Sequence, residues 1–262
     1  MPKVKDILDF VQTLAPAHMA MEWDHIGLLC GRSDREVKRS LVALDPFMHV
    51  AQEAVAEDCQ LLLTHHPSMR NLKKFNDETQ QGRVLLYLVE NGISAVNAHT
   101  NLDCAPGGVN DCFAARLGLS EVQVIDPVGK DETGRDYGLL RGGKLPETSV
   151  EEFLTLVRAG LGCEHLRYVT AGRPITRVAV GGGSCSDGLQ RVVELGYDAF
   201  VTADCKYNTF ADAIDYGITL VDAGHFHTEN PVCAVLAEKV QAAFPEVEVI
   251  LSKTHADCIK FL

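Results

Sequence analysis

The chain has 262 residues, a hydrophobic content of 46% and a formal net charge of −12, from 24 basic and 36 acidic residues. This composition excludes a disordered chain, because enough apolar surface is present to form a core. The acidic balance disfavours a protein that binds nucleic acid or a membrane surface, since both need a basic face.

The N-terminus predicts a short amphipathic helix, and it lacks the apolar core and cleavage site of a signal peptide. Short apolar runs then alternate with longer helical patterns, which indicates an α/β protein. The predicted strands are residues 40–44, 60–64, 93–98, 177–180, 199–202, 218–222 and 247–251. The predicted helices are residues 50–57, 82–91, 109–117, 150–161, 189–195, 207–216 and 232–244.

No apolar run approaches the ~18 residues that a membrane span needs. The nine cysteines are scattered and contain no Cys-x-x-Cys pair, which disfavours both a disulfide framework and a thiolate zinc site. We therefore expect a cytoplasmic protein with reduced cysteines.

An internal repeat divides the chain into two similar halves. In each half a strand, a helix, a strand, a helix and a strand lead to a His-x-x-x-carboxylate segment, His99 to Asp103 and His225 to Glu229. Residues 126–148 are polar and glycine-rich, and we interpret them as the passage between two α/β lobes, with part of them able to form a hairpin. The predicted lobes are residues 1–126 and 127–262, with a metal site between them.

His65 and His66 follow an apolar strand and precede Pro67, so both imidazoles lie at a strand end, where open α/β sheets bind ligands. Adjacent strand residues point to opposite faces, so two neighbouring histidines suit two different ions better than one. Imidazole suits zinc, iron, nickel or copper, and carboxylates extend the range to manganese and magnesium.

The His-x-x-x-carboxylate segments provide the other candidate ligands. Two ions that share such ligands would lower the pKa of a bridging water, so a dinuclear centre favours hydrolysis. Single histidines are more often structural than ligating, and we assign His18, His49, His165 and His255 to that class, with the role of His227 open. The proposed ligands are His65, His66, Asp103, His225 and Glu229, with His99 either a ligand or a partner that orients one.

A glycine turn follows one strand of the second half, at Gly181, Gly182, Gly183 and Ser184. Its backbone N–H groups could bind a substrate phosphate, although a tight strand-to-helix turn explains the sequence equally well. Glu22, Trp23 and Asp24 could line a pocket, but a single tryptophan usually lies in the core.

The motifs MEWDHIGLLCG, LLLTHHP, AHTNLDCAPGGVND, VAVGGGS and DAGHFHTE resemble, in this order, those of the GTP cyclohydrolase 1 type 2 family, the Ngg-interacting-factor-three-like proteins. The resemblance covers nearly the whole chain. It implies two interlinked α/β lobes, a dimetal site with Glu229 as the bridging ligand, and a toroidal homohexamer. Two positions depart from the family pattern: Asn208 stands where a histidine is common, and Arg70 where an aromatic residue is common.

The leading hypothesis is a hydrolase that uses two divalent ions, zinc, iron, manganese or nickel, on a small-molecule substrate such as a nucleotide. By this resemblance a metal-bridging hydroxide would attack an electrophilic carbon such as C8 of GTP, and no protein side chain is assigned as catalytic. The alternative is a metal-binding protein without enzyme activity, for storage, delivery, sensing or as a scaffold, because the amide of Asn208 cannot transfer a proton.

Overall fold

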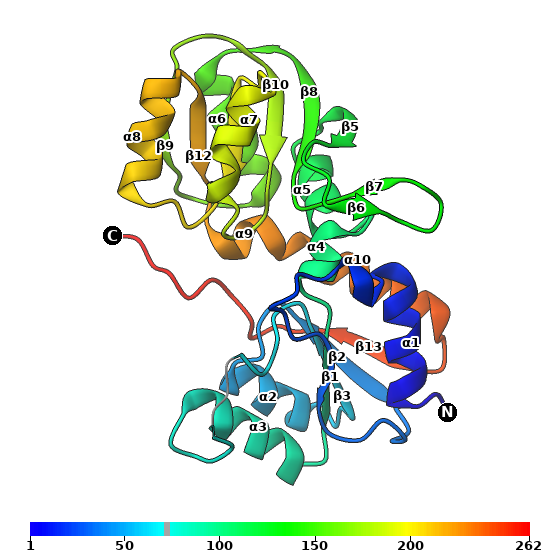
Figure 1. Cartoon of the computed structure of the whole chain (residues 1–262). Helices are drawn as coiled ribbons and strands as arrows, with labels where there is room; N and C mark the ends of the chain where they lie inside the picture. Colours follow the sequence, from blue (N-terminus) through cyan, green and yellow to red (C-terminus); the bar gives the residue numbers. More distant parts are fainter. Residues whose placement is uncertain (71–73) are drawn as a thin grey trace. The chain divides into compact units, whose positions relative to one another are not determined.

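The computed structural model describes residues 1–70 and 74–262 and has two compact units (Figure 1). The first unit contains Met1–Leu102 and Val232–Ala256, and the second contains Asp103–Pro231 and Asp257–Leu262. Each unit has its own β-sheet with helices on both faces (Figure 1).

The sheet of the first unit has five strands in the order β1-β4-β3-β2-β13. The four strands from β4 to β13 are parallel, and β1 pairs with β4 in the antiparallel direction. Every residue of β3 is buried, as expected for a parallel strand that is covered on both faces. The strands are β1 (Gly27–Cys30), β2 (Arg39–Ala43), β3 (Leu61–Thr64), β4 (Ser94–Asn97) and β13 (Glu248–Leu251).

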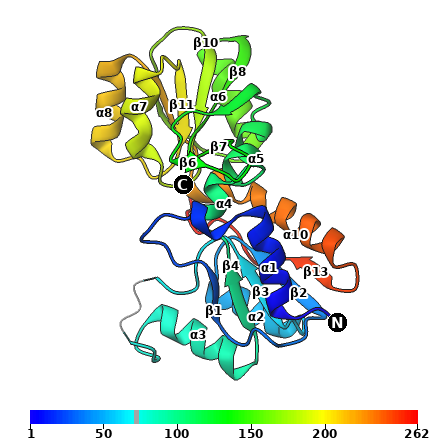
Figure 2. The same cartoon turned by 45° about the vertical axis from the view of Figure 1, so that its right-hand side comes forward.

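Two pairs of helices cover this sheet. Leu62 of β3 packs with α2 and α3 in one core cluster, and its neighbours on the strand point to the opposite face. On that side α1 and α10 lie next to each other, and Phe10 and Phe244 have their rings 5.7 Å apart (Figure 2). The helices are α1 (Val4–Leu14), η1 (Ala17–Met19), α2 (Met48–Ala56), α3 (Gln80–Glu90) and α10 (Pro231–Ala243), while α4 (Thr100–Cys104) spans the division between the units.

The sheet of the second unit has six strands in the order β5-β8-β10-β11-β12-β9. The three strands β10, β11 and β12 are parallel, and the other three pair in the antiparallel direction. The strands are β5 (Ser120–Val124), β8 (Arg141–Thr148), β9 (Arg167–Val169), β10 (Ile175–Val180), β11 (Ala199–Thr202) and β12 (Thr219–Asp222), with a separate hairpin of β6 (Gly129–Lys130) and β7 (Asp136–Tyr137).

Helices cover this sheet on both faces as well. Phe113 of α5 and Phe153 of α6 lie in one core cluster with residues of the sheet. Phe200 of β11 lies in a second cluster with residues of α7 and α8. The helices are α5 (Val109–Arg116), α6 (Val150–Leu161), η2 (Ser186–Gly188), α7 (Leu189–Glu194), α8 (Tyr207–Tyr216) and α9 (His225–Glu229).

The predicted α/β fold and its internal repeat are confirmed. The series β2-α2-β3-α3-β4 of the first unit and β10-α7-β11-α8-β12 of the second have the same order of elements and the same parallel pairing. Each series is followed by a short helix that contains the carboxylate of one of the predicted His-x-x-x-carboxylate segments, Asp103 in α4 and Glu229 in α9. The seven predicted strands are present, with ends that differ by at most two residues.

The interpretation of residues 126–148 as a passage between lobes is wrong for its second part. The hairpin β6–β7 lies there, but β8 follows as an eight-residue strand inside the six-stranded sheet. Gly142 and Gly143 obscure the strand pattern of β8 in the sequence. Both positions need glycine because neighbouring side chains pack closely against them. A Cβ on Gly142 would lie 1.9 Å from the Tyr197 hydroxyl oxygen, and one on Gly143 would lie 2.9 Å from Leu119 Cβ.

The two units differ in extent from the predicted lobes, residues 1–126 and 127–262. Residues 103–126 belong to the second unit, where β5 pairs with β8. Residues 232–256 belong to the first unit, because β13 extends its sheet by pairing with β2. Within residues 1–70 and 74–262, no helix combines the length and apolarity that crossing a membrane requires.

Glu53 attaches the C-terminal part of the first unit to α2. The residue is 9% exposed, and its carboxylate accepts hydrogen bonds from Ser252, from Thr254 and from the Lys253 backbone N–H. Burial raises the pKa of Glu53, but these hydrogen bonds outweigh it and hold the pKa below its usual range.

We therefore expect Glu53→Gln to lower the free energy of unfolding by about 1–3 kcal/mol, because the amide cannot accept all of these bonds. Glu90→Gln, at an exposed position at the end of α3, is the matched control. In the wild type the contribution of Glu53 is present above its unfolded pKa of about 4.3 and is lost as the pH falls through the lower folded pKa. Urea denaturation at several pH values measures both effects, and an equal loss for the two variants would contradict the role of Glu53.

Candidate metal centre

The carboxyl ends of three parallel strands bring polar side chains together in the first unit. β2, β3 and β4 are paired in register, so the residues that follow them meet at one edge of the sheet. Asp45 follows β2, His65 and His66 follow β3, and His99 follows β4. The parallel ladder therefore explains why residues far apart in the sequence form one cluster.

The three imidazoles of this cluster, His65, His66 and His99, form a compact group. The ring centroid of His65 lies 4.9 Å from that of His66 and 5.2 Å from that of His99. The ring centroids of His66 and His99 are 5.5 Å apart. One ring nitrogen of each histidine lies within 4.8 Å of one nitrogen of the other two, so the group could hold a metal ion. His99 thus fits as a ligand as well as an orienting residue.

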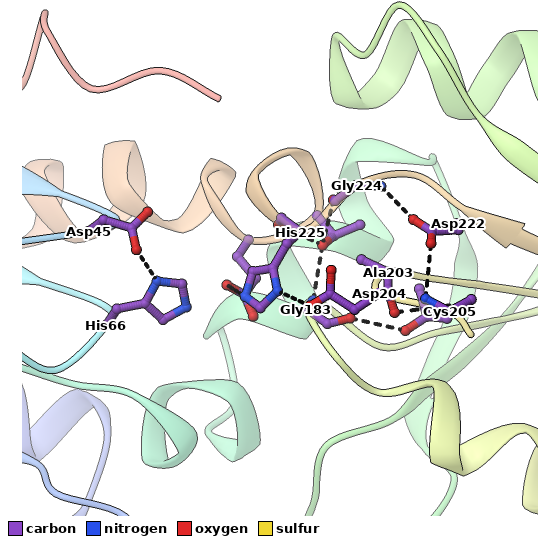
Figure 3. Close-up of polar contacts among 12 residues, drawn as sticks. Asp45, His66, Gly183, Ala203, Asp204, Cys205, Asp222, Gly224 and His225 are labelled. Carbon is purple, nitrogen blue, oxygen red and sulfur yellow. Dashed lines mark hydrogen bonds and ion pairs between the residues drawn. The ribbon is translucent and has the colours of Figure 1, made fainter. Parts of the chain in front are cut away.

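Each imidazole of the group is fixed through its Nδ1. His65 Nδ1 lies 2.9 Å from the carbonyl oxygen of Ala98, which can only accept a hydrogen bond. His66 Nδ1 lies 2.7 Å from Asp45 Oδ1 (Figure 3), and His99 Nδ1 lies 2.8 Å from Asp24 Oδ1. When Nδ1 donates its hydrogen, the lone pair of a neutral imidazole is on Nε2, which is the usual arrangement of a histidine that binds a metal.

The two carboxylates are held in their ionised, accepting form. Burial raises the pKa of Asp24, but hydrogen bonds from His99 and Thr100 outweigh it and hold the pKa well below its usual range. Burial also raises the pKa of Asp45, and hydrogen bonds from His255 and His66 outweigh it in the same way. Both carboxylates therefore stay acceptors, which keeps the proton of each imidazole on Nδ1.

The sequence pattern did not identify Asp45. Its position directly after a predicted strand, like that of His65, was the available signal. His255, assigned to the structural histidines, lies with Nε2 at 3.1 Å from Asp45 Oδ2, so it helps to orient the carboxylate that orients His66.

The second unit has its own candidate ligands at the end of β12. α9 begins at His225, and Glu229 lies four residues later on the same face, so His225 Nε2 and Glu229 Oε2 are 2.9 Å apart. His225 Nδ1 lies 2.7 Å from Asp204 Oδ2 (Figure 3). Burial lowers the pKa of His225, but Glu229 and Asp204 outweigh it and raise the pKa to about 10. A metal ion bound to Nε2 would replace the proton that this nitrogen shares with Glu229.

Asp103 is joined to the other ligands of this unit by Asn110. The Asn110 side chain donates to the Asp103 carbonyl oxygen at 3.1 Å and accepts from the Gly182 N–H at 2.7 Å. The next N–H, of Gly183, donates to the hydroxyl of Thr228, which precedes Glu229. One hydrogen-bonded network therefore positions Asp103, the glycine turn and α9.

The glycine turn makes room for Glu229. A Cβ on Gly183 would lie 2.0 Å from Glu229 Oε1, and its φ of +60° is in the region that favours glycine. The N–H groups of Gly181, Gly182 and Gly183 donate to Val201, Asn110 and Thr228. These contacts favour the tight turn over the phosphate cradle, since three of its N–H groups already have acceptors within the unit.

The remaining candidates lie outside these contacts. His227 forms an ion pair with Asp257, with its Nε2 3.3 Å from Oδ2. Asn208 is exposed in the first turn of α8, and Arg70 is exposed after β3. Trp23 is 68% exposed, so the expectation that it lies in the core is wrong; the residue lies in a turn before β1.

The chain is similar to proteins from several bacteria. It is 32% identical over 264 residues to a protein of Clostridium perfringens named "GTP cyclohydrolase 1 type 2 homolog", with 99% of this chain and 100% of that protein covered. A Streptomyces coelicolor protein of the same name is 34% identical over 267 residues, with 98% and 93% covered.

Solved structures have the same fold. The Bacillus cereus protein related to NIF3 superposes with a TM-score of 0.93 at 22% identity, over 100% of this chain and 99% of that chain. Reduced HcgD from Methanocaldococcus jannaschii superposes with a TM-score of 0.79 at 29% identity, over 96% and 98% of the two chains. A model of one family, described as Duf34/NIF3 (NGG1p interacting factor 3), matches residues 2–258. The chain belongs to the Duf34/NIF3 family.

Proposed function

We propose that this protein is a hydrolase that depends on two divalent metal ions and acts on a nucleotide or a related heterocycle. The observation that carries the proposal is the orientation of the histidines. The Nδ1 atoms of four histidines each lie at a hydrogen-bond acceptor, which makes Nε2 the nitrogen that would bind a metal ion: His65, His66, His99 and His225. The names of the relatives, "GTP cyclohydrolase 1 type 2 homolog", support a nucleotide substrate.

We also propose that the candidate ligands of the two units serve one dinuclear centre, with His99 as a further ligand or as an orienting residue. The donor set fits zinc, iron, manganese or nickel, because it combines imidazole nitrogens with carboxylate oxygens. The proposed ligands are His65, His66, Asp103, His225 and Glu229. The homohexamer and the cytoplasmic location stay predictions.

The bound ions would supply a water molecule of lowered pKa and would polarise the atom that it attacks. The residues of this chain hold the centre in place. Asp45, Asp24 and Asp204 fix the imidazoles, and the glycine turn at Gly183 positions Glu229. Oriented ligands of this kind raise metal affinity because little conformational freedom is lost on binding.

Asn208 favours a second candidate function, a metal-binding protein without turnover. Its amide is exposed on α8 and cannot transfer a proton at neutral pH. The two functions share the metal centre, so metal content tests both, and turnover separates them.

Glu229→Gln is expected to remove at least half of the bound metal. Glutamine keeps the shape that packs against Gly183, so the loss follows from the change of a carboxylate to a neutral ligand. Elemental analysis of protein purified without oxygen measures the effect, and Glu238→Gln, at an exposed position of α10, is the matched control.

The same variant tests whether the centre is dinuclear. Protein loaded with manganese should give the coupled paramagnetic resonance spectrum of two neighbouring ions, and Glu229→Gln should lose the coupling. Unchanged metal content in Glu229→Gln, or a wild-type spectrum of isolated ions, would contradict a dinuclear centre that includes Glu229.

Asp45→Asn is expected to lower metal affinity by about 10–100-fold, although Asp45 is not proposed as a ligand. The amide weakens the contacts that hold His66 and His255. Competition with a chromophoric chelator measures the affinity, and Asp34→Asn at an exposed position of the same unit should leave it unchanged. Equal affinities for Asp45→Asn and the wild type would show that Asp45 does not orient a ligand.

Turnover decides between the two functions. Protein reconstituted with its native metal is expected to open the imidazole ring of GTP and release formate, which can be followed by absorbance and by a formate assay. Absence of ring opening by protein with a confirmed dimetal site would exclude GTP as the substrate. Absence of turnover across nucleotides and related heterocycles would favour the metal-binding protein.

A further inference from the structure

Trp23 is the single tryptophan of the chain, and 68% of it is exposed. An indole is a large apolar group, so exposure forgoes the stabilisation that burial in the core would give. Such a side chain is common where a protein binds a flat partner molecule.

The turn that carries Trp23 is fixed on both sides. The Met21 N–H donates to the Thr100 hydroxyl at 2.9 Å, and the Asp24 N–H donates to the Met21 carbonyl oxygen at 2.9 Å. The Asp24 carboxylate in turn accepts from His99 and from the Thr100 N–H. The backbone of Trp23 is therefore attached to the residues that orient His99, although its side chain is exposed.

The indole lies beside the imidazole group. The ring centroids of Trp23 and His99 are 6.1 Å apart, and their planes are inclined by 74°. The edge-to-face arrangement is a favourable aromatic contact, and it leaves most of the indole surface exposed. A flat molecule stacked on this indole would lie next to the candidate metal ligands of the first unit.

The charges around Trp23 indicate which part of a nucleotide would bind there. Glu22 and Asp24 flank it in the sequence; Glu22 is exposed, and the Asp24 carboxylate accepts hydrogen bonds from His99 and Thr100. The exposed Glu22 carboxylate repels a polyphosphate, whereas it does not repel a neutral ring. The position therefore favours the base over the phosphates.

We propose that Trp23 is the surface on which the planar heterocycle of the substrate stacks, beside the imidazole group of the first unit. This inference rests on the proposed function, because it takes that imidazole group as part of the metal centre. Stacking of one base on an aromatic side chain corresponds to an affinity gain on the order of tenfold to a hundredfold.

The single tryptophan permits a direct test in the metal-loaded wild-type protein. Excitation at the red edge of the indole band selects Trp23, and the titrants are GTP, ATP, guanosine and inorganic triphosphate. We expect the three molecules that contain a base to quench or shift the emission, and triphosphate to leave it unchanged. An emission that none of the base-containing molecules changes would overturn the proposal.

Variants test the same contact by equilibrium dialysis with GTP. Trp23→Leu is expected to weaken GTP binding about tenfold to a hundredfold with an unchanged metal content, and Trp23→Phe to retain part of the affinity. Tyr216→Leu, at an exposed aromatic position on α8 of the second unit, is the matched control. Wild-type affinity in Trp23→Leu would overturn the proposal, and so would a change in its oligomeric state, which would place the indole in an interface between copies of the chain.

Binding and turnover distinguish the failure of this proposal from the failure of the proposed function. Trp23-dependent binding of GTP without ring opening would support stacking and count against the GTP hydrolase. Ring opening of GTP with equal KM values for the wild type and Trp23→Leu would do the reverse.

Discussion

The hydrogen bond at Nδ1 of each candidate histidine determines how the rest of the site can work. Where the acceptor is a backbone carbonyl, as for His65, the position of the strand alone fixes the imidazole. Where the acceptor is a carboxylate, as for His66 and His99, a second set of hydrogen bonds must hold that carboxylate ionised and in place. The affinity of the proposed metal centre would thus depend on residues that would not touch the metal.

The internal repeat provides the same scaffold twice but assigns different residues to it. β3 ends at Thr64 and is followed by His65 and His66, whereas β11 ends at Thr202 and is followed by Ala203 and Asp204. In the first unit that position provides an imidazole, and in the second it provides the carboxylate that orients His225. The two halves of the repeat therefore share the positions at the strand ends, but the side chains at these positions differ in chemistry between the units.

The sequence predicted the strands and the candidate ligands because both follow from local patterns. Apolar runs mark the strands; His65 and His66 directly follow one of them, and His225 lies three residues after another. Asp45 could not be assigned in the same way, because one aspartate after a strand has many structural roles. β8 escaped prediction since its glycines serve close packing against Tyr197 and Leu119, which depends on tertiary contacts that a local pattern does not contain.

The net charge of −12 does not describe the surroundings of the imidazoles. Asp24 and Asp45 are anionic, yet each is compensated by donors within hydrogen-bond distance, so their charges are directed at particular N–H and O–H groups. Divalent ions bound to the Nε2 atoms would make the local potential positive and could attract an anionic nucleotide despite the global charge. Global charge therefore argues against extended nucleic-acid binding, while these local contacts determine which small molecules the site can accept.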